Sequence, residues 1–137
     1  MSYLIDTNVI SELRKGKRTD PGVASWFARL PDQDIFLSVL TLGEIRRGIE
    51  SIRRRDADSA LALDRWLTSL GELHADRILP VDRQVAEEWG RLNVPDPLPV
   101  VDGLLAATAR IAGIALATRN TADFELTGVS CVNPFAF

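Results

Sequence analysis

The sequence predicts an α/β fold in which a central parallel sheet is covered by helices on both faces. The first observation is the run Tyr3–Ile5, which is apolar and β-prone and passes at Asp6 into a helical pattern. The second is that further short apolar runs follow, most of them separated by amphipathic helical segments. The third is the length of 137 residues with 46% apolar residues, which fits one globular domain, residues 1–137.

The first half of the chain alternates strands and helices with recognisable start signals. The first helix carries Val9, Ile10 and Leu13, and the pattern breaks at 16–20. Asp20 before Pro21 predicts the start of a helix to about residue 30, because an acidic cap and an initial proline favour the first turn. A turn at 31–34 separates it from a strand at 35–40.

A capping-box pattern at 41–44 predicts the next helix, whose apolar face holds the residues Leu42, Ile45, Ile49 and Ile52. A break near 56–58 precedes a further helix with Leu61, Leu67 and Leu70. The remaining predicted elements are a strand at 78–81, a helix capped by Asp82, a proline-rich loop at 93–99, a helix at 100–112 ended by Gly113, a strand at 114–118, a loop at 119–124 and a strand at 129–132.

Composition and charge narrow the classes of function. The net charge is −3, so no global basic field indicates a nucleic-acid partner. Of the 16 basic residues only Lys15 and Lys17 are lysines, which suits bidentate phosphate or carboxylate recognition and equally suits a GC-rich genome. The single cysteine excludes an internal disulfide, and neither a signal peptide nor a membrane span is evident, so we expect a cytoplasmic protein.

Four acids stand where predicted strands give way to helices or loops: Asp6, Glu44, Asp102 and Asp123. Ligands of open parallel sheets bind outside the carboxyl ends of the strands, so these acids are candidate site residues. Each also has a structural alternative: a helix N-cap for Asp6, the second half of a capping box for Glu44, a helix-dipole partner for Asp102, and an Asx-type turn for Asp123 with Asn120.

Convergence of these acids would require a cation between them, because like charges raise each other's pKa. Oxygen ligands favour a hard ion such as Mg²⁺ or Mn²⁺. Such an ion can polarise a phosphodiester, activate water and stabilise the leaving oxygen. The lone His74 excludes a histidine-rich metal site, and Cys131 is expected to be a small packing residue.

Four segments together resemble the signature blocks of PIN-domain ribonucleases, and more closely the VapC-like toxins, including their FitB-like branch. They are the residues 4–8 (LIDTN), 42–48 (LGEIRRG), 101–109 (VDGLLAATA) and 117–124 (ATRNTADF). The resemblance spans nearly the whole chain in order. It implies a Rossmann-like α/β/α sandwich and a metal-dependent endoribonuclease. Gly103 stands where many relatives carry alanine, a departure expected to have no consequence.

The resemblance also implies roles for individual residues. The metal-binding acids correspond to Asp6, Glu44 and Asp102, with either Asp123 or the adjacent Asn120 completing the site, and Mg²⁺ or Mn²⁺ as cofactor. The residues expected to support them are Thr7, Asn8 and Thr118. Arg46 and Arg47 follow Glu44 directly and are candidates for contact with the RNA backbone, whereas residues 53–55 are expected to form a solvated helix face.

Partners follow from the same resemblance. Toxins of this family form homodimers and are held inactive by a cognate antitoxin, in some cases within a larger hetero-oligomer. In several relatives the antitoxin places an arginine in the acidic site, where a guanidinium replaces the charge of the metal.

The sequence is also compatible with two rival functions. The first is a non-catalytic module of the same fold that binds RNA or a partner without turnover. The second is an aspartyl-phosphate protein with Asp6 as acceptor, which is disfavoured because no lysine beyond Lys17 is available to hold the phosphoryl group.

Overall fold

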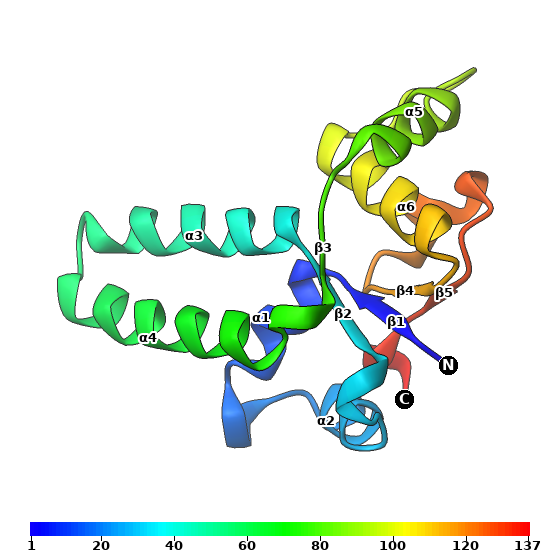
Figure 1. The fold of residues 1–137 in the computed structure, drawn as a ribbon. Coiled ribbons are helices and arrows are strands. Elements are labelled where there is room, and N and C mark those ends of the chain that lie inside the picture. The colour runs from blue at the N-terminus through cyan, green and yellow to red at the C-terminus, as the bar shows by residue number, and fades with distance from the viewer.

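The computed structural model describes residues 1–137 and has a five-stranded parallel sheet between two layers of helices (Figure 1). The strands are β1 (Tyr3–Ile5), β2 (Ile35–Ser38), β3 (Ile78–Leu79), β4 (Ala115–Ala117) and β5 (Cys131–Val132). The helices are α1 (Thr7–Leu13), α2 (Pro21–Ala28), α3 (Val39–Arg53), α4 (Ala57–Leu73), α5 (Arg83–Leu92) and α6 (Val100–Ala112). The α/β/α sandwich implied by the sequence is confirmed.

The strand order is β3-β2-β1-β4-β5, and every neighbouring pair is parallel. The next two strands in the chain, β2 and β3, lie on one side of β1, and the last two, β4 and β5, lie on its other side. The order therefore reverses between β1 and β4, where an open α/β sheet leaves a crevice at its carboxyl edge. Asp6 follows β1 directly and Thr118 follows β4 directly, so both lie at this reversal.

Alternate residues of the central strands enter two separate cores. Ile5 and Ala117 belong to the core shared with α1, α2, α3 and α4, whereas Leu4 and Leu116 belong to the core beneath α6. The continuous apolar character of these strands follows from burial on both faces. In Figure 1, α5 and α6 lie together on one side, and α3 and α4 form an antiparallel pair that extends away from the sheet. None of the helices is both long and apolar enough to cross a membrane.

Most predicted helix ends are confirmed by their caps. The Asp20 carboxylate accepts from the N–H groups of Gly22 and Val23, and Asp82 accepts from Val85 N–H. Gly113 ends α6 with a φ of 68°, in the left-handed region that favours glycine. The strands predicted at 35–40, 78–81, 114–118 and 129–132 and the helix at 21–30 are all shorter in the structure, and residues 39 and 40 belong to α3.

The predicted capping box at residues 41–44 is wrong. Helix α3 begins at Val39, and the hydroxyl of Ser38 caps it by accepting from Leu40 N–H at 3.0 Å. Thr41 is buried inside the helix, and its hydroxyl has no hydrogen-bond partner. Glu44 consequently lies in the second turn of α3, where its carboxylate is free for contacts outside its own helix.

Gly103 has a packing role that its sequence context did not reveal. A Cβ atom at this position of α6 would lie 3.0 Å from both Cδ1 and Nε1 of Trp89 on α5. The indole ring of Trp89 therefore occupies the space that an alanine methyl would need. Contrary to expectation, glycine in place of alanine therefore has a consequence at this position: it lets α5 pack closely against α6.

Gly103→Ala is expected to lower the free energy of unfolding by about 1 kcal/mol, because crowding of the core outweighs the better helix propensity of alanine. Gly90→Ala, in α5 with no atom within 4 Å of its added Cβ, is the matched control. The control is expected to stabilise by about 0.5–1 kcal/mol. Urea unfolding of both variants measures the difference, and equal stabilisation by the two would contradict the packing argument.

A candidate acidic metal site at the carboxyl edge of the sheet

Asp6 is the most enclosed of the four candidate acids. Its side chain is only 5% exposed, and both of its oxygens accept hydrogen bonds. Oδ1 accepts from Thr7 N–H at 2.7 Å, which makes Asp6 the N-cap of α1. Oδ2 accepts from the hydroxyl of Thr118 at 2.8 Å and from the side-chain amide of Asn8 at 3.3 Å. The predicted N-cap role of Asp6 is therefore confirmed, and its role as a metal ligand stays a prediction.

The bond from Thr118 to Asp6 joins the ends of β4 and β1 at the point where the strand order reverses. Two backbone contacts extend this bridge. Arg119 N–H donates to Asn8 Oδ1 at 3.1 Å, and Asn120 N–H donates to the Thr118 hydroxyl at 3.1 Å. The loop after β4 is thereby fixed against the first turn of α1, and Asp6 is held in one orientation.

Glu44 reaches the same place from α3. The hydroxyl of Thr7 donates to Glu44 Oε1 at 2.6 Å, so Thr7 contacts both acids, one through its backbone and one through its side chain. Its predicted supporting role thus extends beyond the first acid. Sequence spacing could not predict this bond, because 37 residues separate the two partners.

The acids interact electrostatically. Burial raises the pKa of Asp6, the bonds from Thr118 and Thr7 act in the opposite direction, and the charges of Asp102 and Glu44 raise it further. Burial also raises the pKa of Asp102, and the charges of Asp123 and Glu44 add to this effect. All four acids therefore contribute to one negative region.

None of the four acids forms an ion pair within the chain. The ion pairs of the structure involve none of the acids Asp6, Glu44, Asp102 and Asp123. A buried carboxylate without a cationic partner carries a large desolvation cost. The donor set consists of oxygen atoms alone and fits a hard divalent cation by its chemistry. No group of three or more His, Cys, Asp or Glu side chains is arranged to hold a metal ion as it stands.

Comparisons with known proteins identify the family. The PIN domain family model matches residues 3–128. The chain belongs to the PIN-domain family. It is 33% identical to "Toxin FitB" of Neisseria gonorrhoeae, covering 96% of this chain and 97% of that protein. It is 31% identical to "VapC ribonuclease Y4jK" of Sinorhizobium fredii, covering 96% of both chains.

Solved structures extend the likeness to three dimensions. The crystal structure of FitAcB from Neisseria gonorrhoeae superposes on this PIN domain with a TM-score of 0.88 and 31% identity, covering 98% of this chain and 99% of that one. The DNA-bound VapBC structure from Salmonella typhimurium, at 21% identity and a TM-score of 0.74, shows the same fold.

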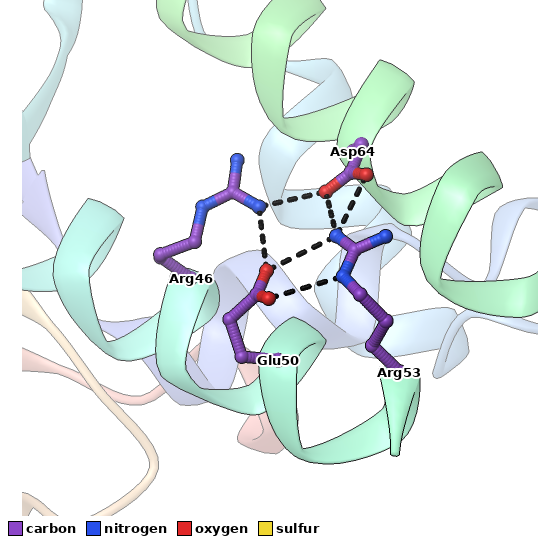
Figure 2. A network of polar contacts seen from close by, with 4 residues as sticks. All are labelled: Arg46, Glu50, Arg53 and Asp64. Atoms are coloured by element: carbon purple, nitrogen blue, oxygen red, sulfur yellow. Dashed lines mark hydrogen bonds and ion pairs between the residues drawn. The ribbon is translucent and has the colours of Figure 1, made fainter. Parts of the chain in front are cut away.

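The arginines of this PIN domain differ in availability. Arg46 is bound by Glu50 at 3.1 Å and by Asp64 of α4 at 2.7 Å, and Arg53 binds the same two acids (Figure 2). Arg46 is thus part of a network that fastens α3 to α4, and its guanidinium already has two carboxylate partners. Arg53, expected to be solvated, belongs to this network too. Arg47 makes no ion pair and shares a shallow groove with Glu44, Leu40 and Val101.

Two further residues, His74 and Cys131, differ in their surroundings. His74 is buried at the end of α4, with its Nδ1 atom 3.0 Å from the carbonyl oxygen of Leu70. Burial raises the pKa of the Cys131 thiol, and the charge of Asp6 adds to this effect. A thiol held protonated is a poor nucleophile, so Cys131 is not a candidate for nucleophilic catalysis.

Proposed function

We propose that this chain is a divalent-metal-dependent endoribonuclease and the toxin of a toxin–antitoxin pair. The observation that carries the proposal is that the charges of Asp6, Glu44, Asp102 and Asp123 act on one another and that none of these acids forms an ion pair. The toxin FitB and a VapC ribonuclease, each matched over almost their full length, support the same reading. The whole chain, residues 1–137, is taken as one PIN domain.

The residues that would hold Mg²⁺ or Mn²⁺ are Asp6, Glu44, Asp102 and Asp123. When bound there, the ion supplies charge neutralisation and activation of water for attack on a phosphodiester. Thr118, Thr7 and Asn8 hold the Asp6 carboxylate in place by the hydrogen bonds described above. Asp123 is favoured over Asn120 as the fourth ligand, because its charge acts on Asp102.

Residues of the chain also affect the ionisation of the acids, the lone pairs available to a ligand and the contact with RNA. Burial and neighbouring acids raise the pKa of Asp6 and Asp102, so a bound cation would favour the ionised form of both. Thr118 donates to Asp6 Oδ2 and leaves fewer lone pairs of that atom free for a ligand. Arg47, which has no acidic partner, remains the candidate for RNA contact beside Glu44.

We further propose that a cognate antitoxin covers the site and that the active toxin is a homodimer. Relatives solved as toxin–antitoxin complexes support the first part, among them FitAcB. An antitoxin arginine entering the cluster would meet carboxylates that lack any internal cation. We propose a cytoplasmic location, which fits an RNA substrate.

The proposal is tested with purified, antitoxin-free protein and a panel of structured cellular RNAs, in Mg²⁺, Mn²⁺ or EDTA. Internal cleavage is expected with either ion and none with EDTA. A second candidate function, a binding module without turnover, is favoured by the lack of a preformed group of three ligands. Tight binding without cleavage of any RNA in either ion would decide for that module.

A further inference from the structure

Arg119 stands at the edge of the acidic cluster and has no part in the proposed metal site. It follows Thr118, whose hydroxyl binds Asp6. Its backbone N–H donates to Asn8 Oδ1, and the amide of Asn8 donates to Asp6. The backbone of Arg119 is thus tied to the candidate site by the same bridge that orients Asp6.

The side chain of Arg119 is positioned by an aromatic ring. Its guanidinium carbon lies 4.1 Å from the ring centroid of Phe135, in the 3₁₀ turn Pro134–Ala136 at the end of the chain. A guanidinium that stacks on a ring uses its face and keeps its N–H donors, which lie at its edge, free. The stack therefore holds an arginine in place without consuming its hydrogen-bonding capacity.

Arg119 has no acidic partner. It takes part in none of the ion pairs of the structure and is exposed. Its charge does reach Glu12 on α1, but that carboxylate accepts from Asp20 N–H at 2.9 Å and from Lys15 at 3.0 Å. Arg46, by contrast, has two carboxylate partners (Figure 2).

The sheet order places Arg119 on the opposite side of β1 from Arg47, another arginine that forms no ion pair. Asp6 ends the central strand β1, whose neighbours are β2 and β4. Arg47 belongs to the helix that follows β2, and Arg119 follows β4. An RNA strand crossing the carboxyl edge of the sheet would meet a free cation on each side of the acids. Such cations offset the repulsion between phosphates and the four carboxylates.

We propose that Arg119, held by Phe135, binds a backbone phosphate of the RNA on the β4 side of the acidic site. This inference rests on the proposed ribonuclease function and names a substrate contact for it. Arg119 touches the substrate away from the scissile bond, so its removal weakens binding more than it slows the chemical step.

The test measures binding and cleavage separately. Binding uses a short fluorescein-labelled single-stranded RNA of mixed sequence and fluorescence anisotropy, with Asp102→Asn as a background that does not cut. Arg119→Gln in this background is expected to raise Kd about tenfold and to lower the slope of log K against log salt by about 0.7, the loss of one phosphate contact. In the cleaving protein, the same change is expected to raise KM about tenfold with kcat nearly unchanged.

Two further variants separate recognition from packing. Arg29→Gln, exposed at the end of α2 and without an ion pair, is the matched control and is expected to leave Kd and the salt slope unchanged. Phe135→Leu keeps an apolar side chain but removes the ring. It is expected to raise Kd less than Arg119→Gln, and to add nothing when the two are combined. Thermal unfolding confirms that each variant is folded.

An unchanged salt slope and Kd in folded Arg119→Gln would overturn the inference. Failure of the parent protein to bind the RNA would also overturn it. An effect of Arg119→Gln on antitoxin binding alone would overturn it too, and would assign Arg119 to a protein contact. Failure of the proposed nuclease function has a different signature: RNA binding that depends on Arg119, with no cleavage in Mg²⁺ or Mn²⁺.

Discussion

Asp102→Asn is expected to lower the rate of RNA cleavage by more than about a hundredfold, because even partners of metal ligands cost 10- to 100-fold when removed. The substitution removes one charge from the cluster and leaves the size of the side chain unchanged. Asp102 makes no hydrogen bond or ion pair that the fold requires and lies in the first turn of α6. The loss therefore reports on the site and not on folding.

Asp32→Asn is the matched control for this experiment. Asp32 is exposed in the turn before β2, at the opposite edge of the sheet from the acids, and makes no ion pair. Cleavage by this variant is expected at the parental rate. Asp6→Asn is the companion variant and is expected to lose cleavage as well. Full activity of folded Asp102→Asn would remove Asp102 from the site.

The second large effect concerns metal binding and stability. Burial and like charges raise the pKa of Asp6 and Asp102, so the ionised forms are disfavoured in the folded metal-free protein. Their stabilising contribution is complete below the ordinary carboxyl pKa and is lost as pH rises through the raised folded values. In the absence of a cation, these two acids therefore oppose folding near neutral pH.

Mg²⁺ or Mn²⁺ is expected to reverse this effect. At about 100 times the dissociation constant, a bound ion stabilises by about 2.7 kcal/mol, which raises Tm by about 5–10 °C in a chain of this size. The increase over EDTA is expected to be larger at about pH 7.5 than at about pH 5, because protons compete with the ion for the raised carboxylates. Scanning calorimetry at both pH values measures it.

The same variants provide the control for the metal. Asp102→Asn is expected to show a much smaller increase in Tm with the ion, and Asp32→Asn the full increase. Metal-free Asp102→Asn is also expected to be more stable than the parent at neutral pH, since one repelling charge is gone. An ion-independent Tm at both pH values would argue that the four acids do not hold a metal.

Local hydrogen bonds were predictable from the sequence because their partners lie two or three residues apart. The caps at Asp20, Asp82 and Gly113 follow from residue type and spacing alone. One predicted cap, Thr41 at the start of α3, is wrong, because residue type and spacing alone do not distinguish it from Ser38. Ser38 and Thr41 both carry a capping hydroxyl, and burial of α3 against the sheet selected the earlier one.

Contacts between distant residues could not be predicted in this way. The partner of Arg46 is Asp64, on a helix that the sequence does not place beside α3, so Arg46 appeared available for RNA. Trp89 gives no sign in the sequence that it fills the space above Gly103. Arg119 lies in the segment 117–124 that resembles a PIN-domain signature block. Its proposed contact with RNA depends on the stack with Phe135, and the order of the strands brings these two residues together.

The sequence by itself determined the alternation of strands and helices and the parallel sheet, since these follow from the apolar period and from residue type at strand ends. Only the tertiary structure decided how the acids relate. The reversal of strand order beside β1 joins Asp6 to Thr118, and the close approach of α1 and α3 joins Thr7 to Glu44. Both bonds link residues far apart in the chain, so they exist only after the sheet and its helices have packed.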